Sequence, residues 1–170
     1  VISMDISTVN PIRALKENPN ENHAALVADV FNLPIKNNSV DCIVASEIIE
    51  HVPDPKLFVD KLIEKLKPRG KLIITTPYDE KIEYYLCVHC YLPTPKNAHL
   101  HSFNKKNIIE LIPSKTSGWR VKSFANKYLI RTGLNLLLSF LPFSLWKFID
   151  RFANTIFSSP TRFIIEIIKK

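Results

Sequence analysis

The chain has 170 residues, a length that suits one domain, and it carries a net charge of +7. Hydrophobic residues make up 46% of the sequence, which is enough for a packed core and excludes a disordered chain. The sequence has three glycines, too few and too scattered for a glycine-rich phosphate loop within these residues. The basic charge favours anionic partners. No basic stripe is interleaved with aromatic residues, so no nucleic-acid partner is expected.

The three cysteines, Cys42, Cys87 and Cys90, are too few and odd in number for a disulfide framework. This cysteine usage is typical of a reducing compartment, and we expect a cytoplasmic protein. The chain opens on a short strand-like apolar run with an early Asp5, which does not resemble a signal peptide.

The first half of the chain alternates between strand-like and helix-like segments. Short apolar runs predict strands over residues 1–4, 24–28, 40–45 and 71–76, with a weak helix over 11–18. A stronger helix follows Asp54 as its cap and Pro55 as its first residue, and Pro68 and Gly70 end it. The run 40–45 is mostly apolar, as expected for a strand buried on both faces.

This alternation predicts an α/β fold of the Rossmann-like, doubly wound kind, with a mostly parallel sheet and helices on both faces. In such open sheets ligands bind beyond the carboxyl ends of the strands. Asp5, Asp29 and the segment 46–51 each follow a predicted strand. The sequence therefore predicts a pocket lined by these three polar clusters.

The second half is less regular, and we expect it to belong to the same single domain, 1–170. A cofactor-binding core over 1–77 is followed by a Cys/His-rich loop over 78–103 and by a helix and a strand within 104–133. An apolar helical insertion over 134–157 precedes a last strand over 162–168. We expect Asn104 to cap the helix of the third segment, with Phe103 packing on that helix as a hydrophobic staple.

The helical insertion ends in an amphipathic stretch. Its expected apolar face holds Phe143, Leu145, Trp146, Ile149, Phe152, Ala153 and Ile156. Pro142 and Lys147 interrupt the apolar run, which argues against a membrane-spanning helix. Two readings stay open: a lid over the sheet or the acceptor pocket, and a helix lying in a membrane interface as a peripheral contact.

A Cys-x-x-Cys pair and a His-x-His pair lie within the loop and at its end. Cys87, Cys90, His99 and His101 supply two thiolates and two imidazoles, a sufficient set for tetrahedral zinc. The alternatives are histidines that serve an acceptor pocket without a metal, and free thiols with no special role.

Three segments of the first 77 residues together resemble a known enzyme family: VISMDIS, LVADVFNLPIKNNSVDCIVASEIIEHVPDP and LKPRGKLIITTP. They resemble the type 11 branch of the class I S-adenosylmethionine-dependent methyltransferases. The segment HLHSFNKKNIIELI extends the resemblance into the second half. It implies a Rossmann-like fold and S-adenosylmethionine as the cofactor.

The resemblance also implies roles for individual residues. Asp5, with Ile6, corresponds to the position that binds the cofactor ribose, and a carboxylate can accept hydrogen bonds from both ribose hydroxyls. Asp29 and the backbone N–H of Val30 correspond to the adenine contacts. The residues after the strand 40–45 line the methionine end of the cofactor and the acceptor; they are Ser46, Glu47 and His51.

The sequence departs from the family at its start, since the family's first strand and its Gly-x-Gly-x-Gly loop are absent. In the family that strand lies centrally, so we expect a gap inside the sheet. We favour a chain that is part of a longer protein. The alternative is a degenerate member of the family.

We therefore expect an enzyme that transfers a methyl group to oxygen on a small-molecule or lipid-linked acceptor. An imidazole titrates near neutrality, which makes His51 the expected base, and Glu47 could orient its ring or join it at a metal. The alternative is a non-catalytic module that binds a partner or a membrane. An NAD-binding domain is a weaker rival, because the EHVPDP turn gives it no support.

Overall fold

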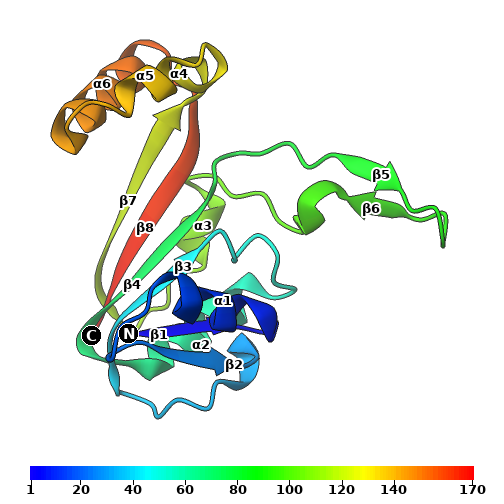
Figure 1. The fold of residues 1–170 in the computed structure, drawn as a ribbon, viewed down its shortest axis with the longest axis vertical. Helices are drawn as coiled ribbons and strands as arrows, with labels where there is room; N and C mark the ends of the chain where they lie inside the picture. Colours follow the sequence, from blue (N-terminus) through cyan, green and yellow to red (C-terminus); the bar gives the residue numbers. More distant parts are fainter.

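A computed structural model describes the chain over residues 1–170, except for the side chains of residues 135 and 137 (Figure 1). The strands are β1 (Ile2–Asp5), β2 (Ala24–Val27), β3 (Val40–Ser46), β4 (Leu66–Pro77), β5 (Tyr84–Leu86), β6 (Pro93–Pro95), β7 (Thr116–Asn126) and β8 (Pro160–Lys169). The helices are α1 (Val9–Glu17), α2 (Pro55–Lys65), α3 (Asn107–Glu110), α4 (Lys127–Arg131), α5 (Leu134–Leu138) and α6 (Phe143–Ile156). Two 3₁₀ turns, η1 (Val30–Asn32) and η2 (Lys96–Ala98), complete the described elements.

The strands form a four-stranded sheet, a two-stranded sheet and a small hairpin. In the larger sheet the order is β3-β4-β8-β7, with β3 parallel to β4 and β8 antiparallel to both of its neighbours. β1 and β2 pair in parallel, and α1 packs against both. The β5–β6 hairpin extends away from the sheet (Figure 1). The α/β class and the Rossmann-like fold are thus confirmed. The expected mostly parallel sheet is instead mixed, because β8 runs antiparallel to both β4 and β7.

The expected gap inside the sheet is confirmed, and it lies between β1 and β3. Among the described residues β1 pairs with β2 alone and β3 pairs with β4 alone, so each presents one open edge. Apolar side chains remain exposed on these two strands, with Ile2 at 56% and Val44 at 64% of their full accessibility. The open edges are a consequence of having no strand between the two sheets.

The core lies between α2 and one face of the four-stranded sheet. Side chains alternate across a strand, so Leu72 and Ile74 of β4 face the core together with their β8 partners Ile167 and Ile165. The helix contributes an apolar stripe to the same layer, made of Phe58, Val59, Leu62 and Ile63. These side chains are almost completely buried, and they hold β3, β4, β8 and α2 as one unit.

The prediction that residues 40–45 are buried on both faces is wrong. Cys42 and Val44 point to the face opposite the core and are exposed. An exposed ion pair between Lys71 and Glu166, with Nζ and Oε1 3.5 Å apart, lies on the same face. Helices over this face are therefore not seen for β3. The apolar sequence of β3 is typical of a strand inside a covered sheet, whereas in this structure β3 is the edge strand of its sheet.

The helix α2 begins as predicted and ends earlier. The Asp54 side chain accepts a hydrogen bond from the N–H of Leu57 at 2.9 Å, which confirms the cap. The helix stops at Lys65, and β4 begins at once instead of at residue 71. Lys169 of β8 donates to the carbonyls of Ile63 and Leu66 at 2.8 and 2.7 Å, so a distant lysine contributes hydrogen bonds to the helix end.

The second half matches the predicted element types with different bounds. β8 is longer than the predicted strand 162–168, because it continues along β7 from Pro160 to Lys169, and β7 begins and ends before the strand expected over 119–128. The helix expected from residue 104 is confined to α3, although the Asn104 side chain does accept the N–H groups of Lys106 and Asn107. The apolar region begins earlier than residue 134 and is divided into α4, α5 and α6.

The helices α4–α6 connect β7 to β8, at the edge of the sheet where β3 and β4 end (Figure 1). Within the part of the chain that the structure describes, none of the helices combines the length and apolar character that crossing a bilayer would need. The face of α6 that packs inward carries Trp146, Ile149 and Ala153, whereas Phe152 and Ile156 of the predicted apolar face are exposed.

Asp150 anchors α6 to the end of β7. Its carboxylate accepts the backbone N–H groups of Ala125 and Asn126 at 3.0 and 2.7 Å, and it is 3% exposed. The Asn126 side chain in turn donates to Asn154 Oδ1 and to the carbonyl of Phe157. Ala125 has a positive φ of 62°, a strained conformation that this network holds in place.

Replacing Asp150 with Ala leaves the buried N–H of Asn126 and the half-buried N–H of Ala125 without an acceptor. We expect Asp150→Ala to lower the free energy of unfolding by about 1–3 kcal/mol. The exposed neighbour on the same helix supplies the control, and Arg151→Ala is expected to change stability by less than about 0.5 kcal/mol. Urea denaturation followed by circular dichroism measures both. Equal midpoints for the two variants would show that the anchor does not contribute.

Candidate functional site

Asp5 lies at the carboxyl end of β1 and is held by two local hydrogen bonds. Its Oδ1 accepts the N–H of Ser7 at 2.7 Å, and its Oδ2 accepts the amide of Asn10 at 3.0 Å. The Asn10 hydrogen bond, followed by that of Ser7, holds the pKa of this carboxyl below its usual value. Each carboxylate oxygen keeps a second lone pair, so the group remains able to accept bonds from a ligand.

The hydrogen bond from Asn10 leads to a pH prediction. Because the folded pKa of Asp5 is lowered, this contact stabilises the fold above the ordinary pKa of 3.8, and the contribution is lost as the pH falls through the folded value. We expect Asn10→Ala to raise the pKa of Asp5 toward 3.8, measured by following its carboxyl carbon by NMR. Asn18→Ala, at the far end of α1, is the control. An unchanged titration in Asn10→Ala would contradict this account.

Asp29 follows β2 and begins the turn η1. Its Oδ1 accepts the N–H of Phe31 at 2.9 Å, so one oxygen caps the turn and the other stays open to a ligand. Val30 and Phe31 are partly buried against the core. The predicted adenine contacts therefore come from a turn that the core itself positions.

The segment after β3 is an irregular turn instead of a helical one. Ser46 and Thr75, at the ends of β3 and β4, share a hydrogen bond of 2.8 Å between their hydroxyls. Glu47 has a positive φ of 52°, and its carboxylate forms an ion pair of 2.9 Å with Arg162 of β8. Glu47 is thus directed toward β8, and it does not share a helix face with His51.

His51, by contrast, meets residues from the far end of the Cys/His loop. Its Nδ1 lies 3.1 Å from the carbonyl oxygen of Ala98, and its ring contacts that of His99 edge-on with the centroids 4.8 Å apart. A ring nitrogen facing a carbonyl must carry the hydrogen, which leaves Nε2 of a neutral His51 with a free lone pair.

Glu50, which the sequence did not single out as a site residue, holds this loop in place. The N–H groups of Leu100 and His101 both donate to its carbonyl oxygen, at 2.8 and 3.2 Å. Its side chain is 2% exposed, with Oε2 accepting the Thr76 hydroxyl at 2.9 Å and Oε1 buried without a partner. An acidic residue inside the apolar stretch Ile48–Val52 was the available sequence signal.

The structure does not bring the predicted zinc ligands together. Cys87 and Cys90 are free thiols on the β5–β6 hairpin. His101 lies against the carbonyl of Val52 at 2.9 Å, while His99 pairs with Glu80. Hydrogen bonds from the N–H groups of Cys90 and His89 lower the pKa of the Cys87 thiol. Among the described residues, these four side chains do not form a group at metal-binding distance.

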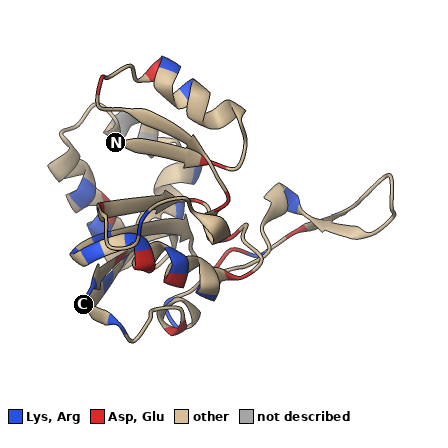
Figure 2. Ribbon diagram, turned by 90° about the horizontal axis from the view of Figure 1, so that it is seen from below, with Lys and Arg blue, Asp and Glu red and all other residues tan. Residues whose placement is uncertain are grey.

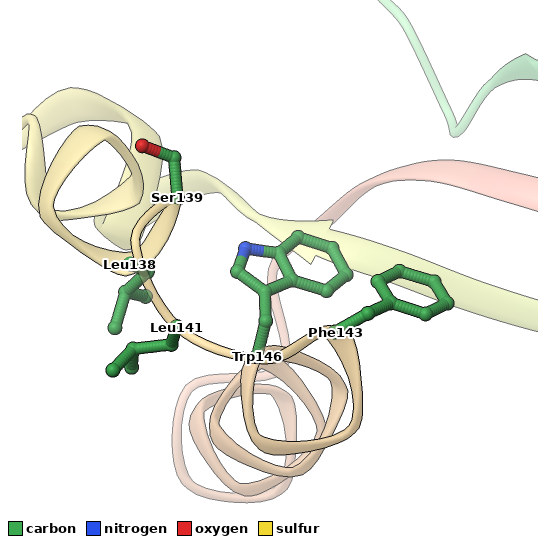
Figure 3. Close-up of a pocket in the computed structure, with 5 residues that line it drawn as sticks. All are labelled: Leu138, Ser139, Leu141, Phe143 and Trp146. Atoms are coloured by element: carbon green, nitrogen blue, oxygen red, sulfur yellow. The ribbon is translucent and has the colours of Figure 1, made fainter.

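An apolar pocket of about 300 Å³ lies between α5 and α6 (Figure 3). Leu138, Ser139, Leu141, Phe143 and Trp146 line it. A neighbouring cavity of about 220 Å³ reaches Asn126 and Asp150. Neither includes Asp5, Asp29 or His51, so both belong to the helical insertion and not to the strand ends.

Charged residues of both signs are spread over the ribbon (Figure 2). Several of the basic side chains are paired, including Lys67 with Asp41 at 2.8 Å and Arg162 with Glu47 at 2.9 Å. Part of the basic side chains is therefore engaged in local ion pairs.

Comparison with known proteins points to methyltransferases. Residues 1–74 match the family model described as a methyltransferase domain. Tocopherol O-methyltransferase from the chloroplast of Arabidopsis thaliana is 27% identical over 107 residues, which is 51% of this chain and 31% of that protein. The chain thus matches about a third of the length of this curated relative.

Solved structures agree on the fold. The chain superposes with a TM-score of 0.60 on an S-adenosylmethionine-dependent methyltransferase from Mesorhizobium loti, at 14% identity, over 99% of this chain and 80% of that one. A Haemonchus contortus phosphoethanolamine N-methyltransferase 2, in complex with phosphomonomethylethanolamine and S-adenosylhomocysteine, gives a TM-score of 0.59 at 18% identity. That match covers all of this chain and 43% of the other.

The chain has the fold of the S-adenosylmethionine-dependent methyltransferases, with acidic residues at the ends of β1 and β2. Residues 1–74, which hold Asp5 and Asp29, are similar to the methyltransferase domain family whose model they match.

Proposed function

We propose that the protein transfers the methyl group of S-adenosylmethionine to a hydroxyl of a small-molecule or lipid-linked acceptor. The observation that carries this proposal is Asp5, held ionised at the end of β1 with lone pairs free for the ribose hydroxyls. The family match covers the residues that surround it.

The cofactor would lie along the ends of β1, β2 and β3. Asp5 and Ile6 would bind the ribose, while Asp29 and the N–H of Val30 would contact the adenine. Ser46 would lie near the methionine end, because its hydroxyl pairs with Thr75 at the end of the neighbouring strand. The gap between β1 and β3 is the place where a further strand would complete this pocket.

The protein would not need to activate the methyl group, because the sulfonium of S-adenosylmethionine already does so. Alignment of the acceptor with the methyl group supplies much of the rate enhancement. A hydroxyl acceptor must also lose its proton, and His51 is suited to take it. Ala98 fixes the hydrogen on Nδ1, so Nε2 is the nitrogen that would accept the proton. Glu47, neutralised by Arg162, would line the acceptor side.

The helical insertion favours an apolar acceptor. α4–α6 lie at the edge of the sheet where β3 and β4 end, and they carry the pocket of Figure 3. The aromatic side chains Phe143, Phe148 and Phe152 are more than half exposed on α6. Such a surface suits a lid over a lipid-like acceptor, and it would also suit peripheral contact with a membrane.

Removing the Asp5 carboxylate tests cofactor binding. We expect Asp5→Ala to weaken binding of S-adenosylmethionine by about ten- to a hundredfold, the effect of losing hydrogen bonds to a charged group. Asp41→Ala, which removes an exposed carboxylate paired with Lys67, is the control. Titration calorimetry on the protein in its full length measures both. Equal affinity in wild type and Asp5→Ala would remove Asp5 from the site.

Removing the His51 imidazole tests the acid–base role. We expect His51→Ala to lower kcat by about 10²–10⁴-fold with an unchanged affinity for S-adenosylmethionine, because the acceptor hydroxyl loses its base. His89→Ala, which removes an exposed histidine on the β5–β6 hairpin, is the matched control. A wild-type kcat in His51→Ala would assign the proton to another group.

A further inference from the structure

Glu50, His51 and His99 come together from two distant parts of the chain. One ligand atom from each, a carboxylate oxygen and two ring nitrogens, lie within 4.8 Å of one another. Within the described part of the chain this is the one group of three or more such residues at that range. We propose that these three residues bind one divalent transition-metal ion of the zinc class.

The carboxylate of Glu50 is the first argument. It is 2% exposed, and Oε1 has no hydrogen-bond partner, although Oε2 accepts the Thr76 hydroxyl. Buried carboxylate oxygens are normally paired, so an unpaired one on a carboxylate that lies close to two imidazoles lacks a cation or a donor. A bound divalent ion would satisfy Oε1 and leave the Thr76 hydrogen bond intact.

The histidine tautomers are the second argument. The Nδ1 of His51 faces the carbonyl of Ala98, and the Nδ1 of His99 faces the carboxylate of Glu80. Both contacts place the hydrogen on Nδ1 and leave Nε2 with its lone pair. A second acceptor behind each ligating ring, often a carboxylate, is the arrangement found around protein-bound metals, where it orients the ring and increases its basicity.

The backbone supplies the third argument, because it holds the two halves of the site together. The N–H groups of Leu100 and His101 donate to the carbonyl of Glu50. His99 is therefore held beside His51 by backbone hydrogen bonds that do not involve the ligating side-chain atoms. Tetrahedral zinc with bonds of about 2.0–2.1 Å separates its ligand atoms by roughly 3.4 Å, so a small closure of the rings completes the site.

The ligand set selects the kind of ion. Two imidazoles and one carboxylate suit Zn²⁺, Co²⁺ or Fe²⁺, whereas Mg²⁺ prefers oxygen ligands alone. Three protein ligands leave a coordination position open, as in catalytic zinc sites. His51 is exposed, which gives the ion a path from solvent.

This site differs from the Cys/His set expected from the sequence and shares only His99 with it. It also competes with the proposed base, since an ion at His51 occupies the lone pair that would accept a proton. Direct metal binding is therefore the readout, and it requires neither S-adenosylmethionine nor activity. Failure of one proposal then leaves the other standing.

The experiment is a Co²⁺ titration of the full-length, tag-free protein, followed by visible absorption, with Zn²⁺ competition for affinity. We expect one ion per chain, and no competition from equimolar Mg²⁺. Glu50→Gln keeps the shape of the side chain, and His51→Ala removes an exposed ring, so both variants are expected to fold. Each is expected to weaken binding by more than about a hundredfold, and Glu80→Gln by about ten- to a hundredfold.

The double variant Cys87→Ser/Cys90→Ser is the control, and it is expected to keep the wild-type affinity. Circular dichroism confirms that each variant is folded. The proposal is overturned if the wild type binds no Co²⁺, or if either Glu50→Gln or His51→Ala binds as tightly as the wild type. Binding lost only in the cysteine variant would assign the metal to the hairpin instead.

Discussion

The pairing of β8 with β4 is the constraint on which the rest of the molecule depends. The last strand of the chain lies between β4 and β7, and its residues Phe163, Ile165 and Ile167 are almost fully buried. Without β8, the apolar face of β4 would lose its neighbour and β7 would have no partner. The burial of these side chains is the main gain that offsets the cost of ordering a strand so distant in sequence.

The same strand positions elements on both sides of the sheet. At one end, Lys169 satisfies the last carbonyls of α2 and so fixes where that helix stops. At the other end, Arg162 pairs with Glu47 in the turn after β3. One strand thus links the core helix to the candidate acceptor side. The helices α4–α6 are held above this edge because they join β7 to β8.

The turn after β3 has two separate tasks. The backbone carbonyl of Glu50 accepts hydrogen bonds from the end of the Cys/His loop. The side chains of Glu50 and His51 lie close to His99 of the same loop. A buried carboxylate and two histidines meet there because the loop returns to the sheet at Phe103, which is buried and bridges to Tyr78. The tertiary return of the loop is what makes this cluster.

The sequence by itself determined the order of the strands and helices over residues 1–77, the resemblance to the methyltransferases and the position of the strand ends. Asp5, Asp29 and the segment 46–51 were predictable because local apolar runs define strands, and parallel strands end at a common edge. The separation of the β1–β2 pair from the four-stranded sheet also matches the expected gap. The cap at Asp54 was predictable because it depends on neighbours within one turn.

Only the tertiary structure decided which side chains meet. Glu47 pairs with Arg162, and His99 contacts Glu80 and His51 instead of the cysteines. These contacts could not be predicted because the partners lie far apart in the sequence. The burial of Glu50 and Asp150, and the exposure of Val44, equally depend on what packs from elsewhere. Local pattern sets the type of each element, whereas long-range contacts set its neighbours, and the chemistry of this site depends on those neighbours.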